Sequence, residues 1–335
     1  MGSDGIGLCR TEHMFFQKNR VSLIRNILFS SSKKKFFYLK KLLKIQKEDF
    51  KKIFMLMNNK IITIRYLDLP LHEFLPNKKM IYNKIKNLIN QSIYNKKVFK
   101  NINSLYKLLE KINEIEEINP MLGFRGCRLG ILQPEIYNMQ TKAIFEAICE
   151  LYQKQKININ LRLMIPFIND INELKIIKFN IQKIASSILN KYNLSKKISY
   201  KFGTMIELPR ACLIADKLSL ISDFLSFGTN DLTQTTFGFS RDDISRYLPH
   251  YLDINIYKKN PFVTIDKYGV GELMKIGICK SKSIKKNIDI GICGEHGGDP
   301  TSIIFANSIG INYISCSPYR IPIARLVCAK LILLK

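Results

Sequence analysis

The stretch FLSFGTNDLTQ, residues 224–234, decides how the rest of the chain is interpreted. It begins with the short apolar run FLSF, whose length and composition indicate a buried strand. The run ends at Gly228, where the backbone can approach a ligand closely and present its N–H groups. Thr229, Asn230 and Asp231 follow, and Asp231 offers a hard oxygen ligand for a divalent cation. The stretch predicts a strand ending in a small polar cup, although an ordinary turn has the same residue types.

Length and composition favour a globular protein. The chain has 335 residues, of which 46% are hydrophobic, enough for one large α/β domain or two smaller ones. No run of about 18 apolar residues predicts a membrane span, and the start has no signal-peptide pattern. The cysteines form no CxxC pair, which argues against a zinc site or a disulfide framework. Reduced thiols predict a cytoplasmic location, with organellar targeting left open.

The net charge of +26 raises the alternatives of a nucleic-acid partner or an anionic surface. The lysines are spread along the chain in pairs, together with many Asn and Ile residues, which favours compositional bias on solvated surfaces. The one local run, residues 33–35, lacks the interleaved aromatic residues of a stacking platform. We therefore predict no nucleic-acid partner and no membrane partner.

Apolar runs alternate with helical patterns, which predicts parallel βαβ units. The expected strands are 5–9, 61–64, 161–165, 202–206, 224–227, 288–293 and 312–316. The longer expected helices are 36–57, 133–156, 172–192 and 320–333, and residues 80–118 are expected to be helical in at least two pieces. Seven or eight units are counted, without a repeat or a clear linker, so residues 1–335 are predicted to form a single domain.

Residues whose side chains can bind ligands or take part in catalysis follow the apolar runs directly. They are Arg10, Arg65, Glu207, Asn230, Asp231 and Cys293. In a (β/α)₈ barrel the strand ends converge on one face, where active sites lie. A doubly wound sheet would align them along one edge. The barrel is preferred because polar residues follow nearly every strand.

Three arginines, Arg10, Arg65 and Arg125, offer guanidinium groups suited to a phosphate, although each alone is more often a surface residue. We expect all three to follow apolar strands. Glu207 and Asp231, after neighbouring strands, predict one Mg²⁺ site with their carboxylates within about 5 Å of one another. The alternative for Glu207 is capping of the helix that Pro209 opens.

Cys293 lies in the glycine-rich turn CGEHGGDP, which predicts an exposed thiol that acts as a proton carrier. Most cysteines are instead buried and inert. His296 is the next candidate for the proton, or it only orients the loop. Arginines, Mg²⁺ and a thiol acid together suit a small phosphorylated enol.

Six ordered motifs cover the chain: CRTEHMFF at 9–16, TIRYLDLPLHEFLP at 63–76, NPMLGFRGCRLG at 119–130, GTMIELPRA at 203–211, LSFGTNDLTQ at 225–234 and GICGEHGGDP at 291–300. They resemble the phosphoenolpyruvate/pyruvate domain of the pyruvate, phosphate dikinase family. Phosphoenolpyruvate synthase and the phosphotransferase-system enzyme I share the SxGTNDLTQ core. CRTEHMFF, LHEFLP and CGEHGGDP look like the dikinase branch.

The resemblance implies a (β/α)₈ TIM barrel that moves phosphate between a phosphohistidine and pyruvate. It further implies a homodimer, Mg²⁺ as cofactor, and ATP, phosphate and pyruvate as substrates of the complete enzyme. The matching substrate-binding residues are Arg10, Arg65, Arg125, Glu207, Gly228, Thr229, Asn230 and Asp231. Glu207 and Asp231 match the metal ligands, and Cys293 matches the thiol that exchanges the methyl proton of pyruvate.

The sequence departs from the family pattern in two respects. It contains neither the nucleotide-grasp domain nor the phosphohistidine domain, and none of its histidines, at 13, 72, 250 and 296, has the phosphohistidine context. The first barrel strand is also expected to be absent, which would leave two unpaired strand edges. The expectation is a fragment, a split gene product or a truncated gene, inactive alone in the overall reaction. A synthase or enzyme I type barrel and a catalytically silent scaffold remain alternatives, although the intact set of site residues speaks against a scaffold.

Overall fold

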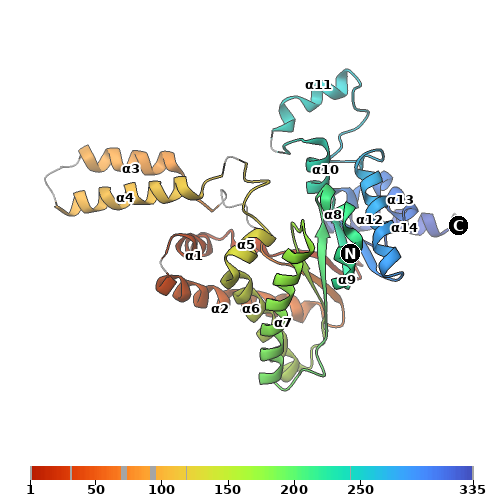
Figure 1. The fold of residues 1–335 in the computed structure, drawn as a ribbon, viewed down its shortest axis with the longest axis horizontal. Coiled ribbons are helices and arrows are strands. Elements are labelled where there is room, and N and C mark those ends of the chain that lie inside the picture. The colour runs from red at the N-terminus through yellow and green to blue at the C-terminus, as the bar shows by residue number, and fades with distance from the viewer. Residues whose placement is uncertain are drawn as a thin grey trace. The chain divides into compact units, whose positions relative to one another are not determined.

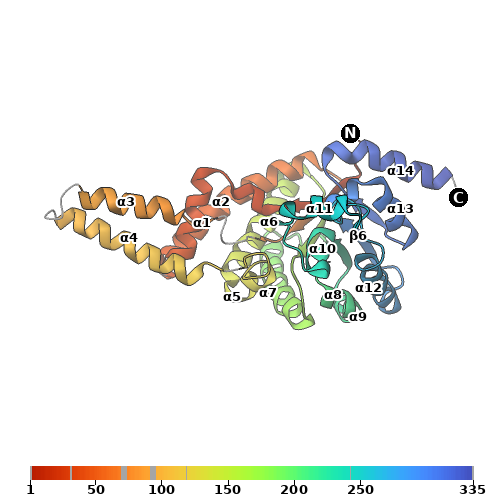
Figure 2. The same ribbon diagram turned by 90° about the horizontal axis from the view of Figure 1, so that it is seen from above.

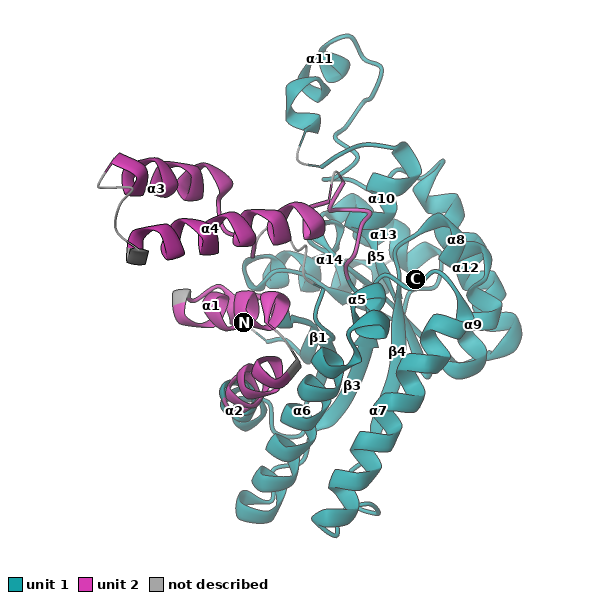
Figure 3. Cartoon of the chain, turned by 60° about the vertical axis from the view of Figure 1, so that its left-hand side comes forward, with its two compact units in different colours: residues 1–11, 45–68, 126–335 teal, residues 12–44, 69–125 magenta. Residues whose placement is uncertain are grey.

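A computed structural model describes residues 2–30, 32–68, 74–90, 96–117, 119–241 and 243–333. Its backbone contacts divide the chain into two compact units, coloured separately in Figure 3. Unit 1 comprises residues 1–11, 45–68 and 126–335, and unit 2 comprises residues 12–44 and 69–125. The motif LHEFLP lies partly, and His72 wholly, outside the described residues. That residues 1–335 form one domain remains a prediction.

Unit 1 is built on a sheet of seven parallel strands, whose order in space is their order in the chain. The strands are β1 (Gly5–Arg10), β2 (Ile61–Arg65), β3 (Asn160–Ile165), β4 (Tyr200–Ile206), β5 (Phe224–Gly228), β6 (Asp289–Cys293) and β7 (Tyr313–Ser315). Each expected strand is present, and each end lies within two residues of its predicted position. The sheet curls into a nearly closed α/β barrel, which is consistent with a TIM barrel lacking one strand, as predicted.

The first and last strands form the seam of the barrel, by which we mean β1, β7 and the junction between them. Among the described residues no hydrogen-bonded ladder joins β1 to β7. The two strands nevertheless approach each other, since a Cβ atom placed on Gly7 would lie 2.7 Å from Ser315 Cβ. Every residue of β1 and β7 is half-buried, whereas every residue of β5 is buried. The seam is therefore closed by side-chain contact and not by backbone pairing.

The barrel interior contains an apolar layer formed by Met164, Met205, Phe224 and Cys293, with Leu8 packed against it. Toward the amino ends of the strands the interior is polar. There the Arg162 guanidinium lies 5.3 Å from the ring centroids of both Phe224 and Tyr313 and 2.8 Å from an Asp289 carboxylate oxygen. A single cation thus links β3, β5, β6 and β7 across the base of the barrel.

Helices surround the strands of unit 1, as the view in Figure 2 shows. They are α5 (Cys127–Leu132), α6 (Pro134–Gln155), α7 (Ile171–Lys191), α8 (Pro209–Leu213), α9 (Ala215–Ile221), α12 (Val270–Ile284), α13 (Pro300–Ser308) and α14 (Ile321–Leu333). Proline opens α6, α8 and α13, where its fixed φ suits the first turn. The long helices α6, α7 and α14 were predicted, whereas α12 and the short α5 and α9 were not. No helix in the described ranges combines the length and apolarity needed to cross a membrane.

The connection from α10 (Thr229–Phe237) to α12 contains a small projecting arm, which we define as residues 239–241 and 243–265. It carries η3 (Ile244–Arg246) and α11 (Leu248–Asp253), and Figure 1 shows α11 beyond α10. Its own small core consists of Ile244, Leu248 and Phe262 with surrounding aromatic rings. The arm thus contains only short helices, and α12 begins after it at Val270.

Unit 2 consists of helices. It contains α1 (Lys18–Phe29), residues 32–44 of α2 (Ser32–Leu56), α3 (Lys78–Asn90) and α4 (Lys96–Ile115). The helices α3 and α4 pack together through Ile81, Ile85, Ile102, Leu109 and Ile112. The two helical pieces predicted between residues 80 and 118 are thereby confirmed.

Candidate active site

The carboxylate of Glu207 is fixed directly after β4. The residue is fully buried, and its Oε1 accepts a hydrogen bond of 2.6 Å from the Phe167 N–H group. A Cβ atom on residue 228 would lie 2.5 Å from Glu207 Oε2, so any residue other than glycine would displace this carboxylate. The N-cap of α8 is Leu208, so Glu207 does not occupy the capping position considered from the sequence.

Phe167 supplies that N–H group from a left-handed backbone conformation, with φ 63°. A bulky residue rarely adopts this conformation, which places backbone strain beside the carboxylate. The Phe167 carbonyl accepts a hydrogen bond from the Cys127 thiol at 3.0 Å, which holds the turn from its other side. Sequence reasoning missed Phe167, because no residue type in the stretch signals a left-handed turn.

The polar cup predicted after β5 is the first turn of a helix. Gly228 is the last residue of β5, and α10 begins at once with Thr229, Asn230 and Asp231. The Thr229 hydroxyl lies 3.1 Å from the Cys293 carbonyl, and Asn230 Oδ1 accepts a hydrogen bond of 3.3 Å from the Glu295 N–H group. Because the Thr229 side chain is buried, its hydroxyl serves these internal contacts. The N–H groups at such a helix start favour an anion.

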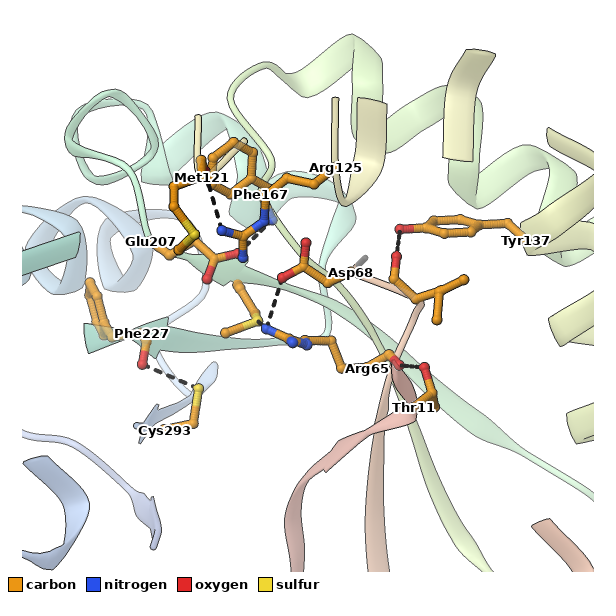
Figure 4. A network of polar contacts seen from close by, with 12 residues as sticks. Thr11, Arg65, Asp68, Met121, Arg125, Tyr137, Phe167, Glu207, Phe227 and Cys293 are labelled. Atoms are coloured by element: carbon orange, nitrogen blue, oxygen red, sulfur yellow. Dashed lines mark hydrogen bonds and ion pairs between the residues drawn. The ribbon is translucent and has the colours of Figure 1, made fainter. Parts of the chain in front are cut away.

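Cys293 is the last residue of β6 and is paired with Gly228 in register. The thiol is 1% exposed and donates a hydrogen bond of 3.4 Å to the Phe227 carbonyl, as Figure 4 shows. The expectation of an exposed thiol is therefore wrong, because β6 carries the residue into the barrel interior. Burial raises the pKa of Cys293 to about 11, while the Ser226 hydroxyl and the arginines oppose the rise. At neutral pH the group is a thiol with a proton to give.

Two predicted arginines end neighbouring strands. Arg10 and Arg65 are partners in the register of β1 and β2. Arg65 is 6% exposed and forms an ion pair of 3.1 Å with Asp68, while Thr11 donates a hydrogen bond of 2.9 Å to the Arg65 carbonyl (Figure 4). The ion pair holds the guanidinium, and the Thr11 bond holds the backbone at the end of β2.

Asp68 was missed from the sequence. A carboxylate three residues after a strand-ending arginine in TIRYLD was the available signal. Its segment is anchored on α6, since the Tyr137 hydroxyl donates to the Leu67 carbonyl at 3.0 Å and the Leu67 N–H donates to Gln140 at 3.0 Å. The anchoring makes Asp68 a fixed counter-charge for Arg65.

Arg125 differs from the other two arginines. It follows α4 and precedes α5, so the expectation that it follows a strand is wrong. It belongs to unit 2, where its Nη1 donates a hydrogen bond of 3.3 Å to the Met121 carbonyl. Its role at the site remains a prediction.

The donor set for a cation consists of Glu207 and Asp231. They follow β4 and β5, which are paired neighbours in the sheet. In the described part of the chain no group of three or more His, Cys, Asp or Glu side chains could hold a metal ion. Two carboxylates with water and substrate oxygens suit Mg²⁺, which seldom takes an all-protein shell. Because residue 228 has no Cβ atom, Glu207 Oε2 is left room to bind a cation. The distance between the Glu207 and Asp231 carboxylates remains a prediction.

Comparison with known proteins shows which family the chain belongs to. Residues 1–332 match the family model described as "PEP-utilising enzyme, PEP-binding domain". The chain belongs to this family.

The curated relatives of this PEP-binding domain include three proteins named pyruvate, phosphate dikinase. Those of Rickettsia prowazekii (strain Madrid E), Giardia intestinalis and Clostridium symbiosum are 48%, 45% and 42% identical to it, each over 98% of this chain. The aligned part is 36%, 35% and 36% of the respective relative, so the chain spans about a third of their length.

Within the PEP-binding domain, two further hydroxyl groups lie near the thiol. The Ser226 hydroxyl lies beside Cys293 and Tyr313 and lowers the pKa of both groups, although burial raises the pKa of each overall. The Tyr313 hydroxyl donates a hydrogen bond of 3.3 Å to the Leu225 carbonyl. Sequence reasoning missed both residues, since a serine inside an apolar run and a tyrosine in a short strand are ordinary features.

Proposed function

We propose that this PEP-binding barrel interconverts pyruvate and phosphoenolpyruvate, as in a pyruvate, phosphate dikinase, with a phosphohistidine as phosphate donor or acceptor. The names of the relatives and the match over the whole chain support this reaction. In the complete enzyme the reaction would be ATP + phosphate + pyruvate = AMP + diphosphate + phosphoenolpyruvate.

The observation that carries the proposal is the buried, protonated Cys293 thiol at the end of β6, paired in register with Gly228 beside the Glu207 carboxylate. A thiol with a raised pKa can deliver a proton to the methylene carbon of an enolate and take it back in the reverse direction. The thiol is 1% exposed and belongs to the apolar layer of the interior. Cys293 is the proposed catalytic acid and base.

The other site residues would bind the substrate. Arg10, Arg65 and Arg125 would neutralise the carboxylate and the phosphoryl group, and the start of α10, with Asn230, would receive an anionic oxygen. Glu207 and Asp231 would hold Mg²⁺, which would stabilise negative charge on an enolate oxygen.

The proposal also covers the binding partners of the chain and its location in the cell. A separate domain or chain would carry the phosphohistidine. A homodimer is supported by α14, on which Leu326, Ile332 and Leu333 are 72%, 74% and 86% exposed. A cytoplasmic location is supported by cysteines that form no disulfide in the described residues.

The test is the exchange of pyruvate methyl protons for deuterium, followed by proton NMR with the 335-residue chain, Mg²⁺ and pyruvate in D₂O. Cys293→Ala should abolish exchange and leave pyruvate binding nearly unchanged, since charge-assisted bonds to arginine, about 1.5–3 kcal/mol each, dominate affinity. Arg65→Ala should weaken binding first. Cys279→Ala is the matched control, because Cys279 is exposed on α12. Exchange at the wild-type rate in Cys293→Ala would contradict the assignment.

A further inference from the structure

His296 is enclosed at the junction of three segments. The imidazole is fully buried in the loop after β6. Its Nε2 lies 2.8 Å from the Pro261 carbonyl oxygen in the arm, and its Nδ1 lies 2.8 Å from the Thr229 hydroxyl at the start of α10. A carbonyl oxygen can only accept, so Nε2 carries a proton. Both ring nitrogens are therefore engaged within the protein.

The Thr229 hydroxyl has one proton and two acceptors within reach. These are His296 Nδ1 at 2.8 Å and the Cys293 carbonyl oxygen at 3.1 Å. When the imidazole is neutral with its proton on Nε2, Nδ1 is an acceptor and Thr229 donates to it. When the imidazole is charged, Nδ1 becomes a donor and Thr229 must turn its proton to the Cys293 carbonyl. The protonation state of His296 therefore decides which bond Thr229 makes.

The surrounding chain leaves little freedom at this junction. Gly294 has φ 119°, and a Cβ atom there would lie 2.7 Å from the Thr229 hydroxyl oxygen. The arm is held to the same region by an ion pair between Arg241 and Glu295 and by a hydrogen bond of 2.9 Å from the Ile265 N–H group to Ser302. A shift of the arm at Pro261 would therefore reach Thr229 through one imidazole.

We propose that His296 is a positioning residue, which in its neutral Nε2–H form accepts the Thr229 hydroxyl proton and couples the arm to the start of α10, where Thr229 packs against Gly294, the residue after Cys293. The effect of His296 on catalysis rests on the proposed function above. The tautomer of His296 and its hydrogen bonds are independent of that function.

The first experiment is nitrogen-15 NMR of histidine-labelled chain between pH 8 and pH 6, with His296 assigned by its loss in His296→Gln. The imidazole should remain neutral with its proton on Nε2. The charged groups that face it are Asp299, Glu295 and Arg241, and burial lowers its pKa. A proton on Nδ1, or titration near the ordinary histidine value, would overturn the proposal. No substrate is required, so this result is independent of the proposed function.

The second experiment separates positioning from mere packing. His296→Leu should lower kcat for pyruvate methyl exchange about 10- to 100-fold and change KM less than about twofold. His296→Gln, whose amide has both a donor and an acceptor, should recover most of kcat. Thr229→Val should lower kcat alone but add nothing to His296→Leu. Equal kcat in His296→Leu and wild type, no recovery in His296→Gln, or additive losses would each overturn the proposal.

The matched control is His250→Gln, because His250 is exposed on α11 of the arm. It should leave kcat unchanged, and an equal loss there would contradict a specific role for His296. If the wild-type chain exchanges no methyl protons, the proposed function fails, while the tautomer is still decided by NMR.

Discussion

The closed wall of the barrel, formed by β3 to β6, differs from the seam in how its strands are held. In the wall, every strand is hydrogen-bonded on both sides and buried for most of its length. At the seam, β1 and β7 are half-buried, and each is paired on one side among the described residues. Glu207, Gly228 and Cys293 all belong to the wall or follow it directly. The residues that need exact placement thus lie where the backbone is most constrained, and Arg10 lies at the looser seam.

The sharpest test of the comparison is a methyl group added inside the wall. In Gly203→Ala the new Cβ atom would overlap the Phe224 carbonyl oxygen. This is a backbone atom, so no change of side-chain rotamer can relieve the overlap. We expect the free energy of unfolding to fall by about 3 kcal/mol, measured by urea denaturation. A loss below about 1 kcal/mol would show that the wall yields as readily as the seam.

A second test removes the cation that connects the wall with the seam. Arg162→Leu deletes the ion pair with Asp289 and the contacts with the Phe224 and Tyr313 rings. Asp289 is partly exposed and keeps Lys201 at 3.4 Å, so no isolated buried charge results. We expect a loss of about 1–2 kcal/mol in unfolding free energy. Arg246→Leu, at an exposed pair in the arm, is the control and should change little.

A third test uses pH. Burial lowers the pKa of His296 in the folded chain below the ordinary value of 6.5. Below that pH the unfolded chain binds a proton that the folded chain does not, so stability should fall as the pH drops. The extra slope is at most about 1.4 kcal/mol per pH unit. Unfolding curves of His296→Gln should lack this slope, and identical acid limbs would contradict the predicted shift.

The smallest effect is expected at the seam. A Cβ atom on Gly7 would lie 2.7 Å from Ser315 Cβ, a side-chain atom, whereas a Cβ atom on Gly203 would overlap a backbone oxygen. Because no ladder fixes β1 to β7 in the described chain, the strands can separate slightly. We expect Gly7→Ala to cost less than about 1 kcal/mol, partly offset by the reduced entropy of the unfolded chain. A loss equal to that of Gly203→Ala would remove the distinction between seam and wall.

The strands and most strand-end residues could be predicted from the sequence, because a buried parallel strand is a short apolar run bounded on both sides by turn-forming or polar residues. Glu207, Gly228 and Cys293 were found in this way. Arg125 was misplaced because a strand-like apolar segment before it belongs to a connection between helices. The exposure of Cys293 was mispredicted because a glycine-rich turn suggests surface, while the preceding strand carries the thiol inward.

Other features depend on contacts between distant segments and leave no local signal. Asp68 matters because α6 fixes its segment beside Arg65. The strained backbone of Phe167 has meaning only beside Glu207, 40 residues away in the chain. The roles of His296 and Ser226 likewise depend on partners in other strands or in the arm. Such pairings are set by topology, which a pattern of residue types does not specify in detail.

The ordering of the seven strands has a consequence for how the chain folds. Each strand pairs with its neighbour in sequence, yet the intervening lengths are unequal, since Gly203 pairs with Phe224 whereas Ile61 pairs with Asn160. Closing a long loop costs more entropy than closing a short one, and distant pairings form slowly. We expect β4 and β5 to form the folding nucleus and β2 to join β3 late. Pulsed hydrogen exchange during refolding should show protection of β4 amides before those of β2, and simultaneous protection would contradict this order.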